Sequence, residues 1–215
     1  MIFTKIDFDT WERRDYFLHY DQQVNCFHST TANIDVTDLM KVIRKHNFNF
    51  FRTFIYIVSR AVNSIPNYKI GLDEHNNLGF YDFISPSYLL FHQDTKTFSC
   101  ASTEYDNDFA LFYKRITGDY EKYKDVHGLF VTDIPRNTFD TSCIPWVKYT
   151  GFELNLPIQN KHYAPIITWG KYGKERRKIL MPLTLSINHA VADGYHVGLL
   201  FNEIQNICDK FRESI

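Results

Sequence analysis

Apolar residues recur every three or four positions in four segments, which is the spacing of an amphipathic helix. The first helix begins near Asp35, which we expect to cap it. The second ends before Pro66, since proline cannot continue a helix. The third contains Gly118, which costs about 1 kcal/mol relative to alanine. The four apolar series are Val36, Leu39, Met40 and Ile43; Phe54, Ile55, Val58, Val62 and Ile65; Phe109, Phe112, Ile116, Tyr120 and Tyr123; and Leu200, Ile204, Ile207, Cys208 and Phe211.

Branched and aromatic residues form β-prone runs between the second and fourth helices. Two runs, 88–92 and 97–105, are joined by polar residues as in a hairpin, and three more follow at 146–156, 165–172 and 179–189. Helices and strands do not alternate one for one, so we predict an α+β fold, a mixed α/β sandwich with helices covering a mixed sheet. No linker or repeat interrupts the chain, so residues 1–215 are predicted to form a single domain.

Composition and charge argue against several kinds of partner. The net charge is −1, and the basic residues are scattered, so we expect no nucleic acid partner. The one basic run, KERRK at 174–178, is predicted to be an exposed hairpin loop. The four cysteines contain no CxxC pair and are predicted to be free thiols in the cytoplasm. No apolar run approaches the roughly 20 residues of a membrane span, so we expect no membrane partner.

A histidine closes the last β-prone run. Apolar and polar residues alternate over 183–187, and the same alternation turns His189 toward the buried side of the sheet. A partly desolvated imidazole stays neutral near pH 7, as a general base requires. Two other interpretations are a core histidine bonded to a backbone carbonyl and a metal site formed by His189, Asp193 and His196. Because Gly194 breaks the helical spacing of those ligands, we predict no metal.

Residues 188–196 read NHAVADGYH and resemble the active-site signature of the chloramphenicol acetyltransferases. The core of this motif, HxxxDG, also occurs in dihydrolipoamide acyltransferases and, more loosely, in condensation-type acyltransferases. Further segments resemble the first family in the same order along all 215 residues: WERRDYF at 11–17, FHQ at 91–93, TFS at 97–99, IPW at 144–146 and APIIT at 164–168. Because the chain has no lipoyl domain or subunit-binding segment, a dihydrolipoamide acyltransferase core is the less favoured interpretation.

The resemblance implies a CoA-dependent acyltransferase-like fold and a homotrimer with active sites between subunits. Acetyl-CoA and chloramphenicol would enter each site from opposite sides and react in a ternary complex. His189 would take the proton of the 3-hydroxyl group, which attacks the thioester and forms an oxyanion. Asp193 would pair with Arg13 to hold the histidine loop, in a structural role. If that pair is largely buried, removing one partner costs about 3 to 5 kcal/mol.

The resemblance also assigns roles outside the histidine loop, although each of these residues could instead be an ordinary sheet residue. Thr168 would orient a water molecule near the oxyanion, and the adenine of CoA would stack on Tyr172. An aromatic and apolar pocket for chloramphenicol would be lined by Tyr20, Cys26, Phe27, Leu89, Phe98 and Cys100.

Two positions depart from the family pattern. Gly151 stands where many members have a serine that stabilises the oxyanion, and loss of such a donor costs roughly 3 to 4 kcal/mol in the transition state. Asn188 replaces a second histidine and is expected to face away from His189. Two alternatives therefore stay open: an acyltransferase that acts on another alcohol, and a non-catalytic trimer that binds or sequesters the antibiotic.

Overall fold

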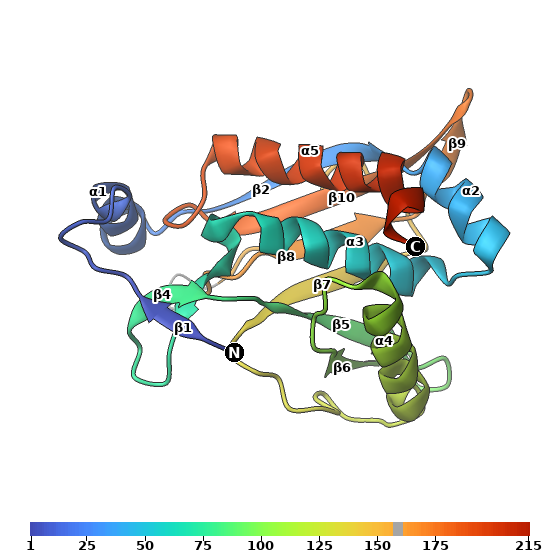
Figure 1. The fold of residues 1–215 in the computed structure, drawn as a ribbon, viewed down its shortest axis with the longest axis horizontal. Helices are drawn as coiled ribbons and strands as arrows, with labels where there is room; N and C mark the ends of the chain where they lie inside the picture. The colour runs from blue at the N-terminus through green and yellow to red at the C-terminus, as the bar shows by residue number, and fades with distance from the viewer. Residues whose placement is uncertain (157–160) are drawn as a thin grey trace.

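A seven-stranded mixed sheet forms the centre of the protein (Figure 1). The computed structural model describes residues 1–156 and 161–215. The strands lie in the order β2-β10-β8-β7-β5-β6, and β9 pairs with β10 outside this path. Pairs β5–β7 and β7–β8 are parallel, and the other pairs are antiparallel, which confirms the predicted mixed sheet. The strands are β2 (Phe27–Asp35), β5 (Ser85–Phe91), β6 (Phe98–Ser102), β7 (Thr138–Ile144), β8 (Ile166–Gly170), β9 (Gly173–Glu175) and β10 (Lys178–Asn188).

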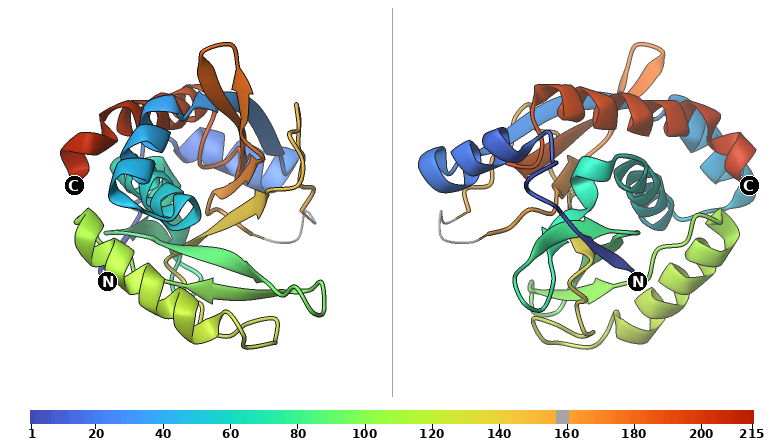
Figure 2. Two further views of the ribbon diagram at one scale, coloured as in Figure 1. Left: turned by 90° about the vertical axis from the view of Figure 1, so that its right-hand side faces the viewer. Right: turned by 60° about the vertical axis from the view of Figure 1, so that its left-hand side comes forward.

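Helices cover this sheet, as predicted, and they lie on one of its faces (Figures 1 and 2). Helices α3 and α5 pack side by side above it, while α4 packs against α3 and β6 (Figures 1 and 2). All four amphipathic segments are helical: α2 (Thr37–His46), α3 (Phe50–Ser64), α4 (Phe109–Tyr123) and α5 (Gly194–Lys210). No helix in the described part of the chain is long and apolar enough to cross a membrane.

The remaining elements are short. A helix continues into a π-helical segment that leads to β2, and this pair lies at one end of the large sheet (Figure 1). A second, antiparallel sheet has the order β1-β4-β3. These elements are β1 (Phe3–Lys5), α1 (Arg14–Leu18), η1 (His19–Val24), η2 (Pro66–Lys69), β3 (Ile70–Leu72), β4 (Leu78–Tyr81) and η3 (Phe211–Ser214).

Three local predictions need correction. Residues 146–156 form no strand; the strand in this region is β7, which ends at Ile144, directly before Pro145. The aromatic residues after Pro145 instead pack on the sheet from a loop, as where the Tyr149 hydroxyl donates to the Thr168 carbonyl over 2.7 Å. The run 97–105 is a strand only over β6. The N-cap residue of α2 is Val36 rather than Asp35. The Asp35 carboxylate nevertheless accepts the N–H of Thr37, the first residue of the helix.

Strand β10 positions the candidate site. Both of its faces are buried over residues 183–187. One face carries Leu183, Leu185 and Ile187, and the other carries hydroxyls that pair with β2: Ser186 with Ser29 over 2.6 Å and Thr184 with Thr31 over 2.7 Å. Because β2 pairs with nine consecutive residues of β10, the end of β10 is fixed in position on that side.

Candidate active site

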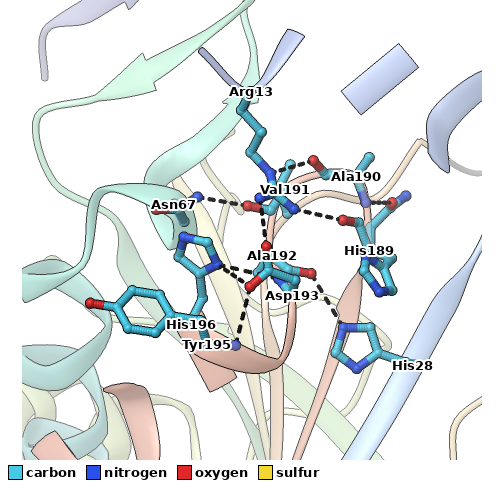
Figure 3. A network of polar contacts seen from close by, with 11 residues as sticks. Arg13, His28, Asn67, His189, Ala190, Val191, Ala192, Asp193, Tyr195 and His196 are labelled. Atoms are coloured by element: carbon cyan, nitrogen blue, oxygen red, sulfur yellow. Dashed lines mark hydrogen bonds and ion pairs between the residues drawn. The ribbon is translucent and has the colours of Figure 1, made fainter. Parts of the chain in front are cut away.

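His189 lies one residue beyond the end of β10, at the start of the loop that leads to α5 (Figure 3). Its backbone N–H donates to the carbonyl of Cys26 over 2.8 Å, which extends the contact between β10 and β2. The alternation of the strand continues, so the imidazole lies on the same face as Ile187. The ring is half-buried, as the sequence predicted.

Two aromatic rings flank the imidazole of His189. Tyr20 stacks on it with ring centroids 3.9 Å apart and planes 22° apart, and His28 lies at 5.0 Å with a tilt of 56°. The Nδ1 atom of His189 is buried and has no hydrogen-bond partner among the described residues. The orientation of the ring therefore depends on packing, and Nε2 is the nitrogen left to meet a substrate.

Arg13 ties the whole histidine loop together (Figure 3). Its Nε donates to the carbonyl of Ala190 over 2.9 Å, Nη1 to Oδ2 of Asp193 over 2.9 Å, and Nη2 to the carbonyl of His189 over 3.0 Å. One guanidinium thus satisfies three acceptors in a loop of five residues, using the fork geometry that lysine lacks. The predicted contact between Arg13 and Asp193 is present.

Asp193 begins helix α5 and does not touch the imidazole of His189. Its Oδ1 accepts from the backbone N–H of Tyr195 over 3.1 Å and lies 2.9 Å from Nδ1 of His196, while Oδ2 accepts from Arg13. Burial opposes ionisation of the carboxyl, but these hydrogen bonds from Arg13 and His196 outweigh burial and lower its pKa to about 2. Since both oxygens already accept N–H bonds, this geometry disfavours the metal interpretation.

The Arg13–Asp193 pair is less buried than the sequence suggested. The Arg13 side chain is 12% exposed, but that of Asp193 is 36% exposed. Solvent screening weakens a pair of this kind, so the expected cost of 3 to 5 kcal/mol for removing one partner is too high for Asp193. The larger cost is expected for removal of Arg13, which leaves three acceptors without this donor.

The lowered pKa of Asp193 gives a pH-dependent contribution to stability. Because its folded pKa of about 2 lies below the ordinary 3.8, the contribution is complete above about pH 4 and is lost as the pH falls toward 2. After discounting for exposure, we expect about 1 kcal/mol. Urea unfolding of the wild type and Asp193→Asn should show a stability gap that closes by most of this amount between pH 5 and pH 2.5. A gap that stays constant over this range, or that also closes for the exposed control Asp125→Asn, would contradict the assignment.

The other predicted residues divide into two groups. Tyr20, Cys26 and Phe27 lie beside the histidine loop, and Phe27 is in register with Asn188. The second group surrounds a cavity of about 660 Å³, whose walls include Leu89, Phe98 and Tyr172 together with Phe50, Trp146 and Trp169. Cys100 lies opposite Leu89 in the β5–β6 hairpin.

This cavity lies far from His189 of the same chain. Its floor includes Trp169, which pairs with Leu183 in antiparallel register, six residues before His189. At about 3.3 Å per residue, the separation along β10 is roughly 20 Å. Thr168 pairs with Thr184 and is roughly 16 Å away by the same measure. One chain therefore brings neither Thr168 nor the predicted CoA and hairpin residues to its own imidazole.

Gly151 lies in the exposed loop after β7. A Cβ atom built at this position meets no atom within 4 Å, and its φ lies outside the left-handed region. A serine therefore fits there without strain, and nothing in the local packing requires glycine. Asn188 turns its side chain to the loop backbone, where Oδ1 accepts the Ala190 N–H over 2.9 Å.

Sequence reasoning missed two residues that contact the loop. His28 lies in β2, which no apolar alternation marks because its sequence FHSTTANID is largely polar. Asn67 donates from Nδ2 to the carbonyl of Val191 over 2.8 Å. Asn67 follows Pro66, where the apolar spacing predicts only the end of a helix, and no motif distinguishes it.

Comparison with solved structures places this architecture among known folds. A chloramphenicol acetyltransferase superposes with a TM-score of 0.84 at 20% identity, covering 96% of this chain and all of that one. A dihydrolipoamide acetyltransferase from Azotobacter vinelandii superposes with a TM-score of 0.65 at 13% identity, covering 93% of this chain and 88% of that one. The fold is that of the CoA-dependent acyltransferases.

Sequence comparison narrows the class further. The sequence model for chloramphenicol acetyltransferase matches residues 1–205. A chloramphenicol acetyltransferase from Clostridium butyricum is 39% identical over 214 residues, covering 99% of this chain and 98% of the relative. The protein therefore belongs to the chloramphenicol acetyltransferase family.

Proposed function

We propose that the protein transfers the acetyl group of acetyl-CoA to the 3-hydroxyl of chloramphenicol, with His189 as the general base. The observation that carries this proposal is the family match over residues 1–205 combined with the constrained histidine loop, in which the ring of His189 contacts both Tyr20 and His28. A rigidly placed base raises the reaction rate because its imidazole does not have to reorient before it removes the proton.

The proposed mechanism uses the two ring nitrogens differently. With its proton on Nδ1, His189 presents a lone pair on Nε2 to the substrate hydroxyl and removes the proton as the oxygen attacks the thioester. The resulting imidazolium returns the proton to the departing thiolate of CoA. Asp193 does not relay the proton, since its carboxylate is bonded to Arg13 and His196 instead.

We further propose that each active site is shared between two copies of the chain in a homotrimer. The support is the separation of roughly 20 Å between His189 and the cavity that carries the remaining predicted residues. Leu89 and Phe98 on that cavity are 37% and 41% exposed, and a second copy would bring its own histidine to them. In this arrangement Tyr172 would stack on the adenine of CoA, and Thr168 would orient a water near the oxyanion.

A complementation experiment tests the shared site. His189→Ala and Phe98→Ala chains, co-expressed, would form mixed trimers in which an intact histidine meets an intact cavity. With random assortment, about one quarter of the sites are complete. The kcat/KM measured at low chloramphenicol should therefore be higher than that of either parent and approach one quarter of the wild-type value. Activity no higher than the mean of the two parents would contradict a shared site.

The oxyanion donor can be tested at Gly151. We expect Gly151→Ser to leave the thermal unfolding midpoint unchanged, because the added side chain meets no neighbour. If the position faces the oxyanion as proposed, the new hydroxyl raises kcat by stabilising the developing charge. Steady-state kinetics with a Gly151→Ala control separate the hydroxyl from the added carbon. Equal kcat values for the two variants would contradict this placement.

The acceptor is tested by the identity of the product. Purified protein incubated with acetyl-CoA and chloramphenicol should yield an ester at the primary 3-hydroxyl, identified by the downfield shift of the adjacent methylene protons in NMR. Esterification at another position would reject the assigned hydroxyl, and the absence of any product would favour a different acceptor alcohol.

We place the reaction in the cytoplasm, in keeping with four unpaired cysteines.

A further inference from the structure

His28 occupies a place on β2 that directs its ring toward the catalytic loop. It is in register with Ile187 of β10, and paired residues of an antiparallel ladder point to the same face. His189, two residues beyond Ile187, continues that face. The two imidazoles therefore approach each other across the strand pair, with ring centroids 5.0 Å apart.

The ring of His28 is also held from its other side. Its Nε2 lies 3.3 Å from the carbonyl oxygen of Ala192 (Figure 3). A carbonyl only accepts, so Nε2 carries the proton, and the ring is tied to the far end of the same loop. His28 thus touches the loop twice, at the ring of His189 and at the backbone three residues later.

His189 has few other constraints on its ring. Its backbone is fixed by Cys26 and Arg13, but Nδ1 has no partner among the described residues. Tyr20 covers one face of the His189 ring by stacking, and the ring of His28 contacts it from β2 at a tilt of 56°. Tilted aromatic pairs at this distance are favourable contacts.

We propose that His28 is a positioning residue for acetyl transfer, whose ring, together with that of Tyr20, holds the His189 imidazole in the orientation needed for proton removal. This inference rests on the proposed role of His189 as the general base. His28 acts through His189 and is not itself expected to exchange a proton with the substrate.

The charge state of His28 suits this role. Burial has the largest influence on the pKa of His28 and lowers it, and the neighbouring His189 lowers it further. The bond to the Ala192 carbonyl and the charge of Asp193 raise it by less, so the net pKa lies below the ordinary value. His28 is therefore neutral near pH 7. A neutral neighbour adds no repulsion to the positive charge that His189 acquires when it takes the proton.

The test compares His28→Ala with His28→Phe, which keeps an aromatic ring but loses the bond to Ala192. We expect His28→Ala to lower kcat by about 10- to 100-fold, the scale of a displacement near 1 Å, with the KM values of both substrates within about twofold. His28→Phe should restore most of kcat. Thr30→Ala, on the same face of β2, is the matched control and should leave both parameters unchanged.

A double-mutant cycle shows whether His28 acts through the base. In the His189→Ala background, His28→Ala should cause no further loss of the residual rate. A full additional loss in the double mutant would overturn the proposal. So would a His28→Ala variant with a raised KM and unchanged kcat, or with a lower unfolding temperature and normal kcat.

The single variants separate this inference from the proposed function. If His189→Ala keeps its activity, the proposed function fails. If His189→Ala is impaired and His28→Ala is normal, only this inference fails.

Discussion

Replacement of His189 by alanine is expected to lower kcat by two to four orders of magnitude, the usual contribution of a general base. The hydroxyl of the acceptor is a weak nucleophile until its proton is removed. The neighbouring imidazoles of His28 and His196 are bonded to the Ala192 carbonyl and to Asp193, so neither is placed to replace His189. Chloramphenicol binding should persist, because the cavity formed by Leu89 and Phe98 is unchanged. Steady-state kinetics and calorimetric titration measure the two effects separately.

The exposed His75 provides a matched control for this substitution. Its side chain is 74% exposed, so His75→Ala should leave kcat, KM and stability unchanged. A His189→Ala variant that retains more than about one tenth of the wild-type kcat would be incompatible with general-base catalysis of this strength. Retained binding with no turnover is the expected pattern for an enzyme that has lost its base.

Replacement of Arg13 by alanine is expected to have the second largest effect. It removes all three hydrogen bonds that hold the carbonyls of His189 and Ala190 and the carboxylate of Asp193. We expect the free energy of unfolding to fall by about 2 to 4 kcal/mol, since buried acceptors lose their donors. We also expect kcat of the folded protein to fall at least tenfold, because the loop that carries His189 is no longer held.

Two further variants define how Arg13 acts. Arg13→Lys keeps the positive charge but cannot bridge three acceptors with a fixed fork, so it should recover only part of the stability and of kcat. Arg14→Ala removes the exposed neighbouring guanidinium and should have little effect on either. Complete rescue by lysine would show that charge alone matters, and that the geometry of the guanidinium does not.

Local pattern predicted those features that depend on a single element. The alternation along β10 was sufficient to direct His189 to the correct face, and helical periodicity located α2, α3, α4 and α5. In both cases one face of the element is buried and carries the apolar residues, so their spacing along the sequence indicates the type of element and its buried face. The Arg13–Asp193 contact, which joins residues 180 positions apart, was reached only through resemblance to a family.

Features that depend on pairing between distant elements were not predictable in the same way. Strand β2 is an edge strand whose polar residues match the hydroxyls of β10, so it lacks the apolar alternation that marks other strands. His28 was missed for this reason. The run 146–156 has β-prone residues, but from a loop Tyr149 bonds to β8 and Trp146 lines the cavity. Composition alone therefore predicted the wrong element.

Acetyl transfer to the 3-hydroxyl can be measured as thiol release from acetyl-CoA by the wild-type protein, with chloramphenicol and its 3-deoxy analogue in parallel. We expect rapid, saturable release of CoA with chloramphenicol. With the analogue, which lacks the attacking oxygen, we expect none above the rate of thioester hydrolysis. Equal release with both compounds, or none with chloramphenicol despite measurable binding, would contradict acetyl transfer to the 3-hydroxyl.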